Sequence, residues 1–344
     1  MLWPSALHPC PTPPVTAIPV RVLAPLFELF EPLFRAAQRR LGASRLAWLF
    51  VGPNLAVFGV FTFLPILINI VYALTGGVKL MPLERPYTGL ENFQILFECG
   101  NYLDLSTCRK DIFWRALLNT AKFSLIQVGL MVLLSLVTAL VLNRRILGRG
   151  FWRGVFFYPV LLSPVVVALI WKWLLQSQGA FNAGLAALGA PPVEWLTDAG
   201  WAFFWAVFVS IWAHMGFYTL ILLAGLQAIP KDLYEAALMD RATPWRTLTR
   251  ITLPLLTPTL IVVLVLSMIR AVQVFDEIFV LTGGGPGSAT TFIVQFIYQT
   301  GFAEQIHLYG LAAAASLTLA AALIVLTLLQ LKATRASQAG ERVR

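Results

Sequence analysis

Arg270 lies well inside one of the long apolar segments of the chain. A charged side chain at the centre of a bilayer costs roughly 2.5–3.5 kcal/mol on insertion scales, so it needs a compensating partner. At helical spacing Ser267 and Val274 share its face, and Glu277 follows one turn later. A guanidinium in this position can donate several hydrogen bonds to hydroxyl or anionic groups along a polar pathway. An internal ion pair with Asp276, Glu277 or a partner subunit is the alternative, and the sequence leaves both open.

A second polar and aromatic face occurs in the preceding apolar segment. Ser210, His214 and Phe217 repeat there at i, i+4 and i+7. These residues are candidates for the same pathway, although His214 bonded to a backbone carbonyl would be purely structural. Lys122 and Lys172 lie close to segment ends, where we expect their ammonium groups to reach water.

The composition requires a largely lipid environment for these segments. Hydrophobic residues make up 58% of the 344 residues, charged residues only 12%, and the mean hydropathy is +0.78. A water-soluble globule cannot bury that much apolar surface. The sequence therefore predicts an all-α polytopic membrane protein with six transmembrane helices. The six segments are 46–74, 116–142, 155–175, 201–228, 255–281 and 307–331.

The positions of the charged residues argue against nucleic-acid binding and orient the chain. The net charge of +9 comes from residues in loops and tails. Lys and Arg are absent from the loops 177–200 and 282–305 and abundant in the loops and tails of the other side. Both termini are therefore predicted to be cytoplasmic. The few, scattered cysteines and histidines indicate no metal site.

These positions also define the predicted domains. Residues 1–45 form a proline-rich cytoplasmic tail, which ends in a helix that lies on the membrane or packs on protein. It lacks the pattern of a signal peptide, so we expect a retained tail or the product of an upstream start codon. The transmembrane domain spans 46–331 and includes the cytoplasmic loop 229–254, and a short cytoplasmic tail, 332–344, follows.

Cys99 and Cys108 share the first loop on the side opposite to the cytoplasm. Oxidation is permitted there, and the residues between them are flexible enough to close a loop. The sequence leaves open whether the two cysteines form a disulfide or remain reduced.

The loop 229–254 has the pattern of two short helices. Pro230 suits a first helical position, and helix formers follow it. Thr243 and Pro244 provide the cap and first position of a second helix, expected to end near Ile251.

Apolar and aromatic side chains in this loop suggest a binding partner. Tyr234, Leu238, Met239 and Trp245 would be a liability in water unless another protein covered them. Pro254 and Pro258 are expected to break the helical pattern where the chain re-enters the membrane. The loop is therefore predicted to be a docking element.

This loop resembles that of the permeases of binding-protein-dependent ABC importers. That family has a Glu-Ala-Ala motif, then Asp-Gly-Ala, then Ile-x-Leu-Pro, and all three elements occur here in register. The family usually has Gly where this chain has Arg241. If that Gly supplies a left-handed turn, Arg incurs a penalty of about 1 kcal/mol or slightly more, so we expect a turn of different shape here. The residues that the resemblance assigns to the loop are Tyr234, Glu235, Ala236, Ala237, Asp240, Ile251, Leu253 and Pro254.

The resemblance implies a type I ABC importer permease fold in a bacterial inner membrane. In the family the helix pair sits in a groove of a cytoplasmic ATPase, which Glu235 would contact. It also implies two ATPase subunits or domains, an extracytoplasmic binding protein and a second permease, usually a different chain. The sequence has no Gly-x-x-x-x-Gly-Lys-Ser/Thr loop, so ATP and Mg are expected on the partner and no cofactor on this chain. The chain itself is expected not to be an enzyme.

Residues 275–287 resemble the carbohydrate-uptake branch of that family. The glycines 283–285, followed by Pro286, predict a tight turn. A sugar or oligosaccharide is the expected substrate, and glycerol phosphate or another polyol stays open because those permeases are similar. Two rival classes are a polytopic membrane enzyme and a secondary transporter. The first requires clustered catalytic groups and the second paired intramembrane carboxylates, and neither pattern is clear here.

Overall fold

The structure is a computed structural model that describes residues 42, 48, 50–102, 104–144 and 146–342, with side chains as far as Lys332. These residues are largely helical and include no β-strand, only two isolated β-bridges. The predicted helix at the end of the N-terminal tail lies outside them. The chain divides into two compact units, Met1–Leu67 and Ile68–Arg344.

The first unit contains most of the first apolar helix, Phe50–Ala73. A π-helical turn, Gly59–Phe63, precedes α2 (Leu64–Ala73). Large apolar side chains are exposed all around this helix, with Phe61 at 75%. A helix that is apolar on every side requires lipid or a partner helix around it. The predicted segment 46–74 is therefore confirmed as helical over its described part.

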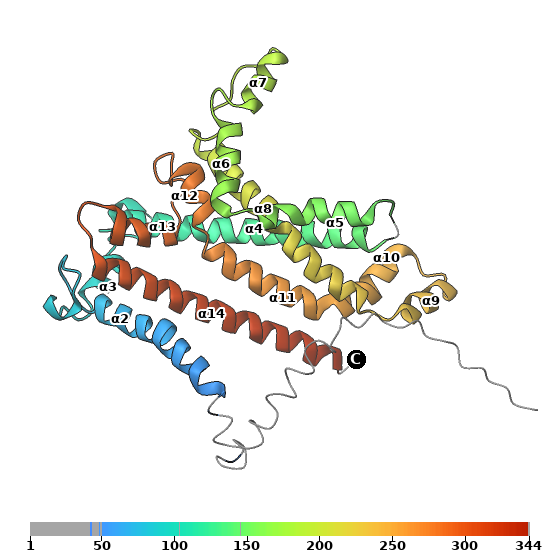
Figure 1. Ribbon diagram of the computed structural model, residues 1–344, viewed down its shortest axis with the longest axis horizontal. Coiled ribbons are helices and arrows are strands. Elements are labelled where there is room, and N and C mark those ends of the chain that lie inside the picture. Colours follow the sequence, from blue (N-terminus) through green and yellow to red (C-terminus); the bar gives the residue numbers. More distant parts are fainter. Residues whose placement is uncertain (1–41, 43–47, 49, 103, 145, 343–344) are drawn as a thin grey trace, which may run out of the picture. The chain divides into compact units, whose positions relative to one another are not determined.

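Three long helices form the centre of the second unit. They are α4 (Asp111–Asn143), α8 (Ala199–Gln227) and α11 (Leu253–Val272), which lie together in Figure 1. Phe123 and Leu222 are fully buried between them. Complete burial of such a side chain contributes about 1.5–3 kcal/mol when it leaves water, although lipid removes much of that term inside a membrane.

At the end opposite to α9 and α10 in Figure 1, α14 (Tyr309–Arg342) packs against α3 (Glu91–Phe97) and α13 (Ile293–Tyr298). Small side chains on α14, such as Ala314, allow close contact there. The helix α14 continues through the predicted tail 332–344 as far as Arg342.

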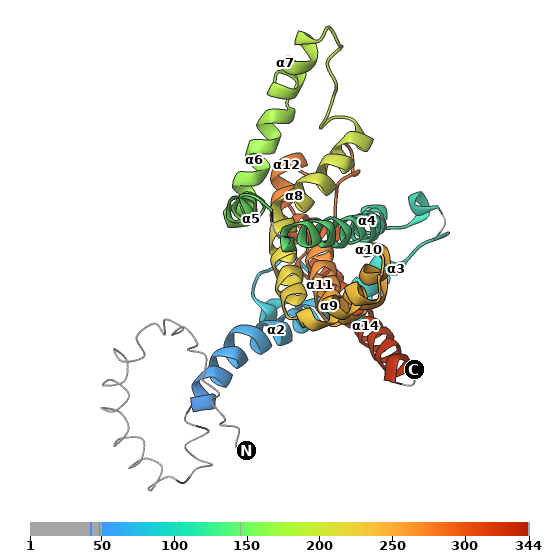
Figure 2. The same ribbon diagram turned by 90° about the vertical axis from the view of Figure 1, so that its right-hand side faces the viewer.

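The third predicted segment, 155–175, is broken. Helix α5 (Arg149–Phe157) ends in a 3₁₀ turn, and α6 (Pro164–Leu175) starts at a bend of 99°. Ser163 is extended, because a residue before proline avoids the α region, and Pro164 then opens the new helix. Figures 1 and 2 both show α6 leaving the direction of α5. A short α7 (Ala180–Ala187) follows α6.

The fifth predicted segment, 255–281, is also two helices. Helix α11 ends at Val272, and α12 (Asp276–Thr282) begins after three residues. The carboxylates of Asp276 and Glu277 lie in the first turn of α12, where the helix dipole favours negative charge. The expectation of one helical face from Ser267 to Glu277 is therefore wrong. In total the described chain has five helices able to cross a membrane, or six if α5–α7 is one bent span, which confirms the predicted polytopic helical architecture.

The loop after α8 forms the predicted helix pair. Helix α9 (Lys231–Met239) is followed by α10 (Pro244–Thr247), and the Thr243 side chain accepts a hydrogen bond from Arg246 N as its cap. The second helix does not end near Ile251, because Pro244–Val272 is continuous.

A π-helical turn, Leu248–Thr252, joins α10 to α11 and explains why Pro254 does not break the helix. Leu253 N donates to Leu248 O across this wider turn. Pro254 follows directly after this turn, and a local π-helical adjustment of this kind accommodates a proline within a continuous helix. Pro258 also lies inside α11, so neither proline ends the helix.

Arg241 terminates α9 in a left-handed conformation. Its φ is 51°, and it is the non-glycine residue with positive φ in the described chain. Arg241 N donates to Leu238 O and Ala242 N to Ala237 O, which is the Schellman arrangement that usually has glycine at this position. The differently shaped turn expected from the departure at Arg241 is therefore not observed, since Arg241 adopts the left-handed conformation that glycine would favour.

Gly216 allows α5 and α8 to touch at their backbones. A Cβ on Gly216 would lie 2.1 Å from Phe156 O and 2.9 Å from Phe157 Cα. Because both neighbours are backbone atoms, no side-chain rotation could make room. The position of the turn after α5 therefore depends on this glycine.

We expect Arg241→Gly to stabilise the turn after α9 by about 1 kcal/mol, because glycine adopts positive φ without steric cost. Hydrogen exchange of residues 231–242 in the purified chain measures this as slower exchange. Arg246→Gly, inside α10, is the matched control and should destabilise its helix by about 1 kcal/mol. Faster exchange in the Arg241→Gly chain would contradict the prediction.

We expect Gly216→Ala to lower stability by about 1–3 kcal/mol, because the new methyl group overlaps the Phe156 carbonyl. The measurement is the melting temperature of the purified chain in detergent. Gly129→Ala in α4 is the control, since nothing lies within 4 Å of a Cβ there. Equal melting temperatures for the two variants would show that α5 and α8 are not in backbone contact.

Candidate functional site

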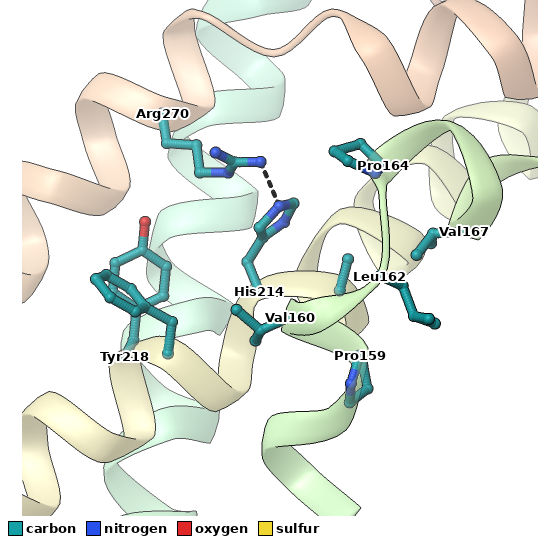
Figure 3. A pocket seen from close by; sticks show the side chains of 10 residues that line it. Pro159, Val160, Leu162, Pro164, Val167, His214, Tyr218 and Arg270 are labelled. Carbon is teal, nitrogen blue, oxygen red and sulfur yellow. Dashed lines mark hydrogen bonds between the residues drawn. The ribbon is translucent and has the colours of Figure 1, made fainter.

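A pocket of about 280 Å³ lies beside Arg270 and His214. Figure 3 shows the side chains that line it. Its walls come from three parts of the fold: the turn between α5 and α6, one face of α8, and the end of α11. The close contact at Gly216 holds the turn against α8. The lining residues are Pro159, Val160, Leu162, Pro164, Val167, Ala213, His214, Phe217, Tyr218 and Arg270.

Arg270 and His214 are joined by a hydrogen bond, drawn as a dashed line in Figure 3. A guanidinium is only a donor, so it donates to His214 Nε2. His214 Nδ1 must then hold the ring proton, which it donates to Ser210 O at 2.8 Å. The imidazole is thus neutral, and its orientation is fixed from both sides.

The structure brings some of the predicted pathway residues together and separates others. His214, Phe217 and Arg270 line the pocket. Ser210 and Ser267 are buried outside it. Ser210 Oγ donates to Glu277 Oε1 at 3.3 Å, and Ser267 Oγ to Leu264 O at 3.1 Å.

Val274 also lies outside the pocket, buried in the main core. It falls in the break between α11 and α12, so the helical spacing that predicted a shared face with Arg270 does not apply. The alternative of an internal ion pair is not observed in the described residues, where Arg270 forms no ion pair within 4.0 Å and bonds to His214 instead.

Tyr218 and the proline-rich turn are site residues that sequence reasoning missed. Tyr218 follows His214 by one helical turn and lines the pocket while 98% buried, so extending the His214 face would have found it. Pro159 and Pro164 in an apolar segment were the signal for the turn. Lys172 was expected to reach water, but its Nζ donates to Val280 O at 3.1 Å, because α12 packs beside α6.

The helix pair presents charged and apolar side chains to solvent. Glu235 and Asp240 are exposed, whereas Ala237 is buried against the rest of the unit. Leu238 and Met239 are 74% and 87% exposed. Ala236 is exposed, and Ile251, Leu253 and Pro254 are half-buried at the start of α11.

The side chain of Tyr234 forms a hydrogen bond that connects α9 to the residue before α11. Its hydroxyl lies 3.2 Å from Thr252 Oγ1, and both residues line a cavity of about 560 Å³ beneath the helix pair. Trp245, 73% exposed, forms part of the same cavity. The loop is therefore a structured element tied to α11, with uncovered apolar side chains of the kind that mark a docking surface.

At the opposite end of the unit, a disulfide between Cys99 and Cys108 crosslinks the first loop. In the same first loop, Arg85 is buried and donates to Thr75 Oγ1 at 3.0 Å and to Lys79 O at 2.7 Å. Burial lowers the pKa of the Arg85 guanidinium, and the nearby rings of Tyr72 and Tyr309 act in the opposite direction.

The glycine-rich turn after α12 has the tight geometry that its sequence predicted. Gly283 and Gly284 have φ of 65° and 97°. Gln295 Nε2 donates to Gly283 O at 2.7 Å, and a Cβ on Gly284 would lie 2.4 Å from that nitrogen. The turn is thus locked onto α13, and its role is structural.

The chain matches a family model described as "Binding-protein-dependent transport system inner membrane component" over residues 131–335. It is 40% identical over 293 residues to the trehalose/maltose transport system permease protein MalF of Thermococcus litoralis, covering 85% of this chain and 94% of that protein. It is 31% identical over 293 residues to the lactose transport system permease protein LacF of Rhizobium radiobacter, covering 84% and 93%.

The fold is similar to a chain from the crystal structure of a bacterial ABC transporter involved in the import of the acidic polysaccharide alginate. The TM-score is 0.72 at 27% identity, and the match covers 89% of this chain and 99% of that chain. A structure of the alginate transporter in complex with its alginate pentasaccharide-bound periplasmic protein matches with a TM-score of 0.71 at 26% identity, over 85% and 95%.

These matches confirm the predicted type I ABC importer permease fold. They also confirm that the chain is a permease and not an enzyme. They support neither the membrane enzyme nor the secondary transporter considered above. The matched region includes α8, the helix pair and α11, so the pocket and the docking loop both lie within it. The chain is a member of the binding-protein-dependent transport system inner membrane component family.

Proposed function

We propose that this chain forms part of the translocation pathway of an importer for a sugar or oligosaccharide. The observation behind this proposal is the pocket at Arg270 and His214. Donors on Arg270 and the hydroxyl of Tyr218 suit sugar hydroxyls, and the exposed ring of Phe217 suits the apolar face of a sugar. Relatives named for maltose, trehalose and lactose transport support the same substrate class.

The pocket and the docking loop share two helices. α8 leads from His214 into α9, and α11 leads from the helix pair to Arg270. In the proposed importer, two cytoplasmic ATPases bind ATP and Mg, close on ATP and move the loop. That movement reaches the pocket through both helices and biases the inward-open and outward-open states.

The proposed assembly also contains a second permease, usually a different chain, and an extracytoplasmic binding protein that delivers the substrate. Both termini of this chain are then cytoplasmic, and the Cys99–Cys108 loop faces the binding protein. The absence of Lys and Arg from the loops 177–200 and 282–305 supports this orientation.

We expect Arg270→Ala to reduce substrate uptake about tenfold or more, because a charge-assisted hydrogen bond in a water-poor site contributes about 1.5–3 kcal/mol. Uptake and substrate-stimulated ATPase activity of the complete transporter are the measurements. Lys122→Ala is the control, since it also removes a cation from a membrane helix but lies outside the pocket. Unchanged uptake together with unchanged stimulation would remove Arg270 from the pathway.

We expect Glu235→Ala to reduce both uptake and substrate-stimulated ATPase activity about tenfold or more without altering the melting temperature. Glu235 is exposed and free of ion pairs within the described residues, so its carboxylate is available to a cation of the ATPase. Removing one member of a charge pair buried on docking costs about 2–5 kcal/mol. Asp232→Ala, in the first turn of the same helix, is the control. Full stimulation in Glu235→Ala would contradict this role.

An anionic substrate, such as an acidic oligosaccharide or a phosphorylated polyol, is a second candidate. It is favoured by the Arg270 guanidinium, which lines the pocket without a carboxylate partner among the described residues. Uptake of a labelled neutral oligosaccharide, a uronic acid oligosaccharide and glycerol phosphate separates the two. Selective uptake of an acidic compound that Arg270→Ala abolishes would support this candidate over the neutral sugar.

A further inference from the structure

Two arginines of α5 converge on the last residue of α8. Arg149 and Arg153 lie one helical turn apart. With the Gln227 amide oriented so that its oxygen faces them, that oxygen accepts from Arg153 Nη2 at 2.9 Å and from Arg149 Nη2 at 3.0 Å. Two positive charges thus share one neutral acceptor.

The arginine pair lacks a counter-charge in the part of the chain that the structure describes. The ion pairs found there all lie in the first loop and the start of α4, and none includes Arg149 or Arg153. The Nε atoms of both arginines are buried without a hydrogen-bond partner. Side-by-side guanidinium groups repel each other, and an anion placed between them would reverse that interaction.

The side chains around the pair are those of a membrane interface. Leu147 and Phe151 are 98% and 68% exposed, and Trp152 and Val155 are 46% and 45% exposed. A short helix with arginines on one face and exposed aromatic and aliphatic side chains on the other is typical of contact with lipid headgroups and the acyl chains below them. Trp is enriched at that depth.

We propose that Arg149 and Arg153 bind the phosphate of an anionic phospholipid, with its acyl chains along Phe151 and Val155. The excess positive charge favours a headgroup of net negative charge over a zwitterionic one, because nothing on α5 offers a carboxylate to a choline or ethanolamine group. The site adjoins the start of the helix pair, since Gln227 ends α8. It is independent of the substrate that the pocket takes.

Lipid retention on the purified full-length chain tests this site. Native mass spectrometry of the chain, exchanged into detergent with equal amounts of phosphatidylglycerol and phosphatidylcholine, counts the lipids that stay bound. We expect about a tenfold preference for phosphatidylglycerol in the natural chain, as two arginines beside an anionic headgroup predict. The double variant Arg149→Gln, Arg153→Gln should retain both lipids equally.

Three variants make the test specific. Gln227→Glu should lower the preference although both arginines remain, because its carboxylate then occupies them. The double variant Arg149→Lys, Arg153→Lys keeps the charge and should keep most of the preference. Arg109→Gln, which removes an arginine ion-paired with Glu98 in the first loop, should change nothing.

Equal retention of the two lipids by the natural chain would overturn the proposal. So would a preference that survives in the double glutamine variant while that variant keeps the melting temperature of the natural chain. If the lipid counts are equal in all chains, and the double glutamine variant no longer copurifies with the ATPase when the complete transporter is prepared, the arginines serve a protein partner and the lipid site is refuted.

Discussion

The close packing of α8 against its neighbours at two glycines, Gly216 and Gly225, is the constraint on which both the pocket and the helix pair depend. At Gly216 the α5 backbone occupies the space that a Cβ would need, and at Gly225 a Cβ would lie 2.6 Å from Thr259 Oγ1 of α11. Small residues at such contacts give helices in lipid their main source of association, since lipid removes the hydrophobic driving force. The first contact sets the pocket wall opposite His214. The second joins α8 to α11 near the helix pair.

Polar groups inside the second unit form hydrogen bonds between neighbouring helices. Three of these groups bond to a side chain or a backbone carbonyl of a neighbouring helix. Arg270 donates to a histidine, Lys172 to a carbonyl of α12, and Ser210 to Glu277. These bonds tie α8 to α11 and α12, and α6 to α12. A movement that separates these helices therefore has to exchange the bonds, which suits two discrete arrangements better than a gradual deformation.

The positions of several functional groups are set by the points at which a helix ends or bends. The bend before Pro164 brings a proline-rich turn to the pocket, and the break after Val272 places Glu277 on a separate helix. The π-helical turn at residues 248–252 has the opposite effect, since it keeps α10 and α11 continuous. A continuous helix transmits a displacement along its axis, whereas a turn absorbs it. Such continuity fits the coupling role proposed for the loop.

The sequence by itself determined the class of protein and the helix pair α9–α10. Apolar length fixes which segments can cross a bilayer, and the caps and turn residues around α9 and α10 act over a few residues only. The left-handed turn at Arg241 did not follow from the sequence, because the steric cost of positive φ for Arg suggested a turn of different shape. Tertiary structure decided the rest. The prolines of segment 155–175 are visible in the sequence, whereas the contact of α5 with Gly216 of α8, which holds the turn beside the pocket, is a feature of helix packing. The sequence also did not show the π-helical turn that precedes Pro254. Arg270 bonds to His214, 56 positions away in the chain, because the packing of α8 against α11 brings the two side chains together. The periodicity within a single segment does not contain that information.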